Sequence, residues 1–124
     1  MIKPYGKELI IDLHNCDPSK FNRKDLDIFF EELCKLLKMR KCERYWWDDY
    51  NVPVKERQTE PHLKGTSAIQ FIMTSNITIH TLDIMKNVYI NIFSCKPFNV
   101  QKAHRFCRKF FDGKIVHKYV IVRF

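Results

Sequence analysis

SAIQFIMTSNITIHTL, residues 67–82, is the stretch of this chain from which the fold class follows most directly. Residues 67–73 and 77–82 are rich in β-branched and other apolar residues, as half-buried strands are. Thr74, Ser75 and Asn76 separate the two runs, and polar residues of this kind favour a turn. The stretch therefore predicts two adjacent strands with polar side chains where they join.

Further strands are expected on both sides of this pair, at residues 8–14, 43–47, 87–94 and 115–122. Between the second of these and residue 67 lies a polar stretch, residues 48–64, which we interpret as one long loop. Loops of this length are often functional.

Two amphipathic helices complete the predicted set of elements. The first follows an N-capping Asn22, ends near Lys38 and has its apolar residues at helical spacing, namely Leu26, Phe29, Phe30, Leu33 and Leu37. The second follows an N-capping Asn99, and Gly113 is expected to end it from the C′ position. Its apolar stripe consists of Ala103, Phe106, Cys107, Phe110 and Phe111.

These elements predict an α+β fold, a two-layer α/β sandwich in which both helices pack on one face of a mainly antiparallel sheet. Each helix has a single apolar stripe, so the opposite sheet face would lie open to solvent, to a site cleft or to a second subunit. At 124 residues the chain is expected to form one domain over residues 1–124.

Charge and cysteine content bear on the partner and on the cellular compartment that we expect for this protein. The net charge is +8, but acidic residues accompany the basic ones from residue 20 to residue 44. Lys102, Arg105, Arg108 and Lys109 form a basic patch on the second helix, which we interpret as a solvated face because no aromatic residues interleave there in the manner of a nucleic-acid reader. The apolar run at residues 9–13 is too short and too interrupted for a signal or membrane segment, so we expect a cytoplasmic protein. Five cysteines without a CxxC pair predict reduced thiols.

Three side chains near the predicted strand pair have the chemistry of a catalytic site. Ser75 supplies a hydroxyl, His80 alternates away from the face shared by Ile77 and Ile79, and Cys95 ends the next strand. A nucleophile, a base and a thiol are the groups needed for covalent or proton-transfer catalysis. The alternative is that the histidine and the cysteine only pack in the core. The spacing of these residues in the sequence does not distinguish a catalytic site from packing in the core.

Several separated motifs resemble the prokaryotic S-adenosylmethionine decarboxylase family. GTSA at residues 65–68, TSNITIHT at 74–81 and NIFSC at 91–95 fall in register with its G-x-S-x segment, its self-cleaving serine with T-I-H-T, and its D-x-F-T-C segment. YGKEL at residues 5–9 is similar to its opening strand. The similarity covers most of the chain and is weakest at residues 43–64.

The resemblance implies a proenzyme that makes its own pyruvoyl cofactor from Ser75 by cleavage between Thr74 and Ser75. The pyruvoyl carbonyl would form a Schiff base with the substrate amine and act as an electron sink for loss of carbon dioxide. It also implies that His80 assists the elimination, that Ser67 supports the tetrahedral step and that Cys95 protonates the product carbon. The implied substrate is S-adenosylmethionine, decarboxylated for spermidine biosynthesis, and the implied assembly is a homodimer or higher homo-oligomer. From the residues themselves we expect no metal, no membrane and no nucleic-acid partner.

Two departures from the family pattern leave alternatives open. Thr74 replaces the usual glutamate before the cleavage serine, and Leu82-Asp83-Ile84 replaces the W-P-E segment whose acid would bind the substrate ribose. One alternative is a pyruvoyl-dependent decarboxylase of another amino acid, such as arginine or ornithine. The other is an uncleaved, non-catalytic regulatory or binding homologue.

Overall fold

Six strands form one antiparallel sheet in the computed structural model, which describes residues 2–124. The strand order across the sheet is β2-β3-β4-β5-β1-β6, and every neighbouring pair runs antiparallel. The strands are β1 (Gly6–His14), β2 (Lys41–Trp47), β3 (Gly65–Ile72), β4 (Ser75–Leu82), β5 (Asn87–Ser94) and β6 (Lys114–Arg123).

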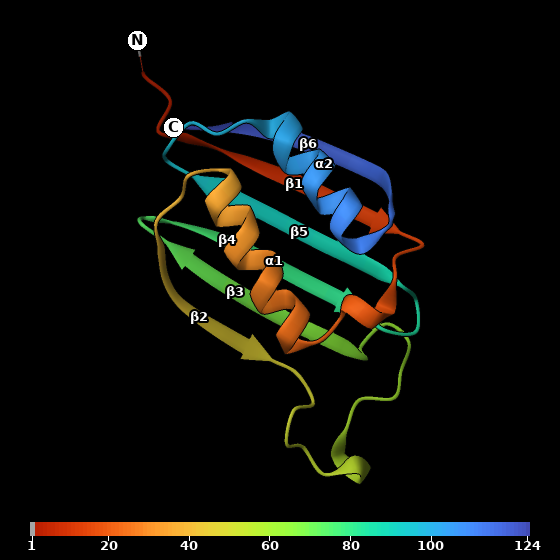
Figure 1. Cartoon of the computed structure of the whole chain (residues 1–124). Coiled ribbons are helices and arrows are strands. Elements are labelled where there is room, and N and C mark those ends of the chain that lie inside the picture. The colour runs from red at the N-terminus through yellow and green to blue at the C-terminus, as the bar shows by residue number, and fades with distance from the viewer. Residues whose placement is uncertain (1) are drawn as a thin grey trace.

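Two helices, α1 (Arg23–Leu36) and α2 (Val100–Phe111), lie side by side over one face of this sheet (Figure 1). Short 3-10 helices occupy Pro18–Lys20 and Val54–Glu56. The predicted α+β sandwich, with both helices on one face, is confirmed. No helix within residues 2–124 is long and apolar enough to cross a bilayer.

Both predicted N-caps are present. The side chain of Asn22 accepts a hydrogen bond from the backbone N–H of Asp25 at 2.9 Å, and that of Asn99 accepts one from the N–H of Lys102 at 3.0 Å. Each bond satisfies an N–H group that the first helical turn leaves without a partner. The two asparagines therefore fix where α1 and α2 begin.

The end of α2 differs from the prediction in its mechanism. The residue with left-handed backbone is Asp112, with φ of 48°, and Gly113 has no positive φ. A Cβ on Gly113 would lie 2.6 Å from the Sγ of Cys16. Glycine is therefore needed at this position for close packing against Cys16, and not for its backbone conformation.

The core lies between the helices and the covered face of the sheet. Phe29 of α1 is fully buried and packs against Phe111 of α2, with ring centroids 5.1 Å apart. The covered face contributes alternate residues of the central strands, all fully buried: Leu9, Ile11, Leu13, Ile77, Ile79, Val88, Ile90 and Ile92. Burying an aliphatic side chain of this size contributes about 1.5–3 kcal/mol, so this layer holds the central strands rigidly in place.

The opposite sheet face carries no helix and exposes large apolar side chains, among them Tyr45, Trp47, Phe71, Tyr119 and Ile121. The loop at residues 48–64 extends beyond one end of the sheet (Figure 1). Its first residue, Asp48, accepts two hydrogen bonds from the guanidinium of Arg23, at 2.7 and 2.8 Å. This bidentate pair ties the start of the loop to α1.

Candidate active site

The β3–β4 hairpin places Ser75 at one end of the sheet. Ile72 pairs with Ser75, so the turn consists of Met73 and Thr74, and Ser75 is the first residue of β4. The polar residues 74–76 predict a turn that contains Ser75, whereas Ser75 belongs to the strand. Its side chain is only 7% exposed, because it shares the covered face with Ile77 and Ile79.

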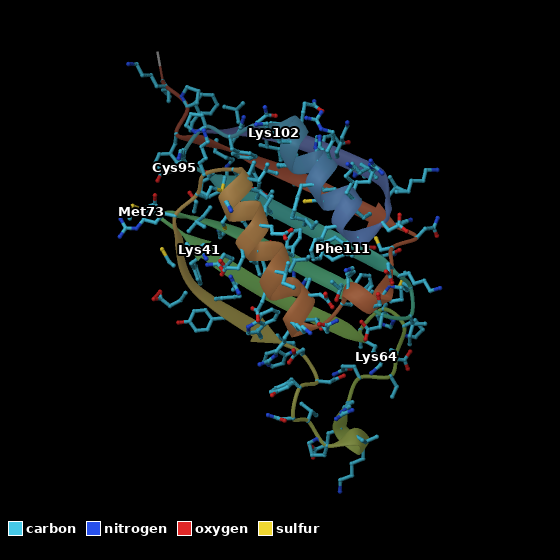
Figure 2. All side chains as sticks on the ribbon, in the orientation of Figure 1. Lys41, Lys64, Met73, Cys95, Lys102 and Phe111 are labelled. Atoms are coloured by element: carbon cyan, nitrogen blue, oxygen red, sulfur yellow. The ribbon has the colours of Figure 1, made fainter. Side chains whose placement is uncertain are left out.

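Cys95 follows the last residue of β5 and lies against Ser75. The backbone N–H of Cys95 donates a hydrogen bond to Ser75 Oγ at 3.0 Å, and the Ser75 hydroxyl donates to Cys95 Sγ at 3.7 Å. Figure 2 shows Cys95 beside Met73 at this end of the sheet, and Cys95 Sγ lies 3.9 Å from the Met73 carbonyl oxygen. The structure therefore brings the predicted hydroxyl and thiol together.

Thr74 is the second neighbour of the thiol, with its Oγ1 3.1 Å from Cys95 Sγ. The hydrogen bond with Thr74 is the main cause that lowers the pKa of Cys95 below its ordinary value, followed by those with Ser75 and Tyr5. Hydrogen bonds to a thiolate favour the charged form. The thiol at this position can therefore give up a proton readily.

The pKa of three other cysteines is shifted in the opposite direction. Burial raises the pKa of Cys16 and of Cys34 to about 11 in each case, and it also raises the pKa of Cys107. Buried thiols of this kind are inert packing residues. Cys95 therefore differs from these three cysteines in both location and acidity.

Tyr5 and Gly6 are site neighbours whose contacts with Cys95 were not foreseen from the sequence. A Cβ on Gly6 would lie 2.2 Å from the carbonyl oxygen of Ser94, so only glycine lets the start of β1 come this close to the end of β5. Tyr5, the residue before Gly6, is among the groups that lower the pKa of Cys95. The YGKEL match at residues 5–9 was the available signal, but it indicated a strand and did not indicate a contact.

Ser67 and His80 form a second pair on the uncovered face of the sheet. They are direct partners in the register of β3 and β4, and Ser67 Oγ lies 2.7 Å from His80 Nδ1. The prediction that His80 faces away from Ile77 and Ile79 is confirmed. His80 is exposed and available to a group outside the chain.

The four predicted residues do not form one pocket within a single chain. Ser75 and His80 are five residues apart on β4, which corresponds to about 17 Å, and their side chains point to opposite faces. The chain therefore carries two separate pairs, Ser75 with Cys95 and Ser67 with His80.

The sequence matches the model of the S-adenosylmethionine decarboxylase family over residues 7–124. The chain belongs to this family. The family is one of carboxy-lyases. A search of curated proteins gave no match to the chain.

A solved structure supports the same fold for this S-adenosylmethionine decarboxylase family member. The crystal structure of the adenosylmethionine decarboxylase from Aquifex aeolicus VF5 superimposes with a TM-score of 0.77, covering 98% of this chain and 92% of that one. The sequence identity is 19%, so the likeness concerns the fold alone.

A cavity of about 630 Å³ lies beside the Ser67–His80 pair in this family member. Trp47 and residues of the loop at 48–64 form its outer wall, with Asp49, Glu56 and His62 among them. The loop of weakest family similarity is thus the one that encloses the space next to His80. A cavity of this volume can hold a small molecule.

Asp83 lies outside this cavity. Leu82 lines the cavity beside His80, whereas Asp83 lines a different one, of about 390 Å³, together with Arg23 and Asp49. Burial raises the pKa of Asp83, and its Oδ1 has no hydrogen-bond partner among residues 2–124. The carboxylate of Leu82-Asp83-Ile84 is therefore turned away from His80.

Within residues 2–124, no group of three or more histidine, cysteine, aspartate or glutamate side chains is placed to hold a metal ion.

Proposed function

We propose that this chain is a pyruvoyl-dependent decarboxylase that cleaves itself between Thr74 and Ser75 and then decarboxylates S-adenosylmethionine. The product would be the aminopropyl donor for spermidine biosynthesis. The observation that carries the proposal is the Ser75 hydroxyl held by Cys95 at the tip of a hairpin, in a chain that matches the family over residues 7–124. The five free cysteines suit a reducing compartment, and we place the protein in the cytoplasm.

The proposed cleavage uses only groups of the chain itself and one molecule of water. Ser75 Oγ attacks the carbonyl carbon of Thr74, the peptide C–N bond breaks, and the hydroxyl proton passes to the new amine, which leaves an ester. Loss of the Ser75 Cα proton then breaks the Cβ–O bond and releases the Thr74 carboxylate. Water hydrolyses the resulting dehydroalanine and ammonia departs, leaving a pyruvoyl group at the new N-terminus.

Two contacts of the Ser75 side chain favour its attack on the carbonyl carbon of Thr74. The N–H of Cys95 holds the oxygen in one position, and Cys95 Sγ, 3.7 Å away, accepts a hydrogen bond from the Ser75 hydroxyl. The lowered pKa of Cys95 favours its thiolate, which can accept that proton. Cys95 is therefore proposed to act on the Ser75 hydroxyl first and to protonate the product carbon later.

Backbone strain at Thr74 also favours cleavage. Its φ of 52° is left-handed, and Thr74 is the only β-branched residue with positive φ within residues 2–124. Such a conformation costs on the order of 1–3 kcal/mol. The strain is relieved when the Thr74–Ser75 peptide bond breaks.

A homodimer would unite the two separated pairs. If two copies stack their uncovered sheet faces about a two-fold axis that runs across the strands near Thr78, β4 of one copy lies antiparallel over β4 of the other. His80 and Ser67 of one copy then lie over the end of the sheet that carries Ser75 and Cys95 in the other, and two equivalent sites result. The exposed Tyr45, Trp47 and Phe71 are placed to be buried in such a contact.

In the site of this proposed dimer, each side chain is proposed to take part in one step of the chemistry. The pyruvoyl group supplies the electron sink for loss of carbon dioxide. His80, oriented by its bond with Ser67, is proposed to move the proton in the elimination at Ser75, and Ser67 to support the tetrahedral step. Cys95, which stays beside position 75 after cleavage, is proposed to donate a proton to the product carbon.

The position of Asp83 favours a second candidate substrate class. Ile84 stands where the family pattern has its ribose-binding acid, and Asp83, one position earlier, lines a different cavity from the one beside His80. Asp49 and Glu56 line the cavity beside His80 instead. A cationic amino acid without a ribose, such as arginine or ornithine, also fits these surroundings.

Release of carbon dioxide from carboxyl-labelled substrates tests the proposal. Purified protein is incubated with S-adenosylmethionine, arginine and ornithine in parallel, with Ser75→Ala as the control. Release from S-adenosylmethionine supports the first candidate, and release from arginine or ornithine alone supports the second. A cleaved protein that releases carbon dioxide from none of them contradicts both.

A further inference from the structure

A basic cavity lies next to the proposed cleavage site. Its volume is about 290 Å³, and Thr74 and Cys95 form part of its wall. The charged residues in its wall are Lys38, Arg40 and Lys96, and none of them is acidic. Three cationic residues thus surround one side of the bond that we propose to break.

The fold holds these cationic residues against the hairpin turn. The ammonium of Lys96 donates to the carbonyl oxygen of Lys38 at 2.6 Å, and the carbonyl oxygen of Arg40 accepts a hydrogen bond from the N–H of Met73 at 3.1 Å. The segment that connects α1 to β2 is therefore hydrogen-bonded both to Lys96, which lies between β5 and α2, and to Met73 in the hairpin turn.

No carboxylate in the described part of the chain compensates these charges. The ion pairs within residues 2–124 involve other basic residues, namely Lys20, Arg23, Lys41, Arg44, Lys64, His117 and Arg123. Lys38, Arg40 and Lys96 are exposed and form no ion pair within that range. An anion brought to this cavity would therefore find unpaired cations.

We propose that this cavity is a carboxylate-binding site that captures the new C-terminus at Thr74 once the chain is cut. The inference rests on the proposed self-cleavage. Elimination of the ester places a full negative charge on Thr74, in the wall of the cavity that Lys38, Arg40 and Lys96 line. Guanidinium and ammonium groups bind carboxylates through charge-assisted hydrogen bonds.

Capture of this carboxylate has two consequences for the site. The Thr74 carboxylate is held away from the new pyruvoyl end, so it does not add back to the carbon from which it was released. The Thr74 hydroxyl, which lies 3.1 Å from Cys95 Sγ in the uncut chain, also moves away and leaves room for substrate beside the thiol. The basic cavity thus completes the conversion of a proenzyme site into an open active site.

Digestion by a carboxypeptidase tests this site directly. Each cleaved protein has two C-termini, at Thr74 and at Phe124, and the mass of each chain reports the trimming of each end. Phe124 is 74% exposed, so its release serves as an internal standard. The test variant is Lys38→Met with Arg40→Met and Lys96→Met. The control is Lys102→Met with Arg105→Met and Lys109→Met, which removes three charges from the exposed side of α2.

The expected result is release of Thr74 that is at least roughly tenfold slower, relative to Phe124, in wild type and in the α2 control than in the test variant. Because the test variant can fail to fold, wild type is also digested in about 1 M salt, where screening should remove most of the protection. Equal rates in all samples, with no effect of salt, overturn this inference alone. A chain that stays uncut overturns it together with the proposed self-cleavage.

Discussion

The backbone N–H of Cys95 donates a hydrogen bond to Ser75 Oγ across 3.0 Å, although Ser75 begins β4 and Cys95 follows the end of β5. The bond joins the residue that is proposed to be consumed in making the cofactor to the residue that remains to handle protons. Because it uses the backbone of Cys95, it survives any change of that side chain. The position of Ser75 Oγ and the acidity of the Cys95 thiol can therefore be altered separately.

Replacing Thr74 by valine should raise the pKa of Cys95. Valine keeps the shape of threonine but removes the hydroxyl that is the main cause of the lowered pKa. The measurement is the pH dependence of alkylation by iodoacetamide in a Ser75→Ala chain, which stays uncut, with Cys42→Ser to remove the other exposed thiol. Reaction of the parent should begin at lower pH than for an ordinary cysteine, and Thr74→Val should shift the profile upward.

The buried cysteines provide the control for this alkylation. Cys16, Cys34 and Cys107 should stay unmodified in the native protein over the same pH range, because burial raises their pKa. Identical profiles with threonine and valine at position 74 would refute the role given to the Thr74 hydroxyl.

Co-expression of two inactive variants should restore activity if the site is shared between copies. A Ser75→Ala chain keeps His80, and a His80→Ala chain keeps Ser75. Random pairing would give mixed dimers with one complete site, and about a quarter of the wild-type activity per chain. Carbon dioxide release is the readout. If the mixture is as inactive as each variant alone, while wild type is active, the proposed two-fold arrangement is wrong.

Relief of backbone strain at Thr74 should slow self-cleavage. Thr74→Gly removes the cost of the left-handed φ of 52°, so the uncut state becomes more stable relative to the transition state. With strain on the order of 1–3 kcal/mol, a decrease of roughly tenfold in the cleavage rate is expected.

The rate is followed by gel after synthesis in a cell-free system. Thr74→Val is the matched control, since it lacks the hydroxyl as glycine does but keeps a β-branched residue at the left-handed φ. Cleavage of Thr74→Gly as fast as that of wild type would show that strain does not contribute.

Acid should destabilise the fold in part through His104. This residue of α2 is 5% exposed, and neither ring nitrogen has a hydrogen-bond partner among residues 2–124. Burial lowers its pKa in the folded state, and the nearby Lys118 adds to the effect. The unfolded chain, with a histidine pKa near about 6.5, then binds more protons, so the free energy of unfolding falls as pH drops below that value, by at most about 1.4 kcal/mol per pH unit.

Chemical denaturation at pH 7.5 and pH 5 measures this contribution. His104→Leu should lose less stability than wild type between the two conditions, and His62→Gln, an exposed control in the loop at residues 48–64, should behave as wild type. An equal loss in wild type and in His104→Leu would contradict the assignment.

Local sequence patterns were sufficient for much of the fold. Asn22 and Asn99 cap their helices as predicted, because a cap depends on residues within one turn of it. His80 faces the uncovered side as predicted, because alternation along a strand is also local. Gly113 follows the C-cap residue Asp112, the position predicted for it, but the reason for a glycine there lies in tertiary packing. Gly113 is required by the Sγ of Cys16, a residue distant in sequence that no local pattern could place there.

The site was foreseen residue by residue but not in its geometry. Spacing and family resemblance identified Ser67, Ser75, His80 and Cys95, yet neither predicted that they separate into two pairs. That separation follows from the register of β3 and β4, in which Ile72 pairs with Ser75 and Ser67 pairs with His80. If the turn were one residue longer or shorter, the register of β3 and β4 would change, and Ser75 would face the other side of the sheet.

The intact mass of freshly purified wild-type protein, next to that of Ser75→Ala, tests self-cleavage most directly. Wild type should give two chains, residues 1–74 and 75–124, with the second blocked to N-terminal sequencing by its pyruvoyl group. Ser75→Ala should give one chain of about 15.0 kDa. A wild-type protein that also remains a single chain under native conditions would contradict the proposed cofactor and, with it, the proposed decarboxylase.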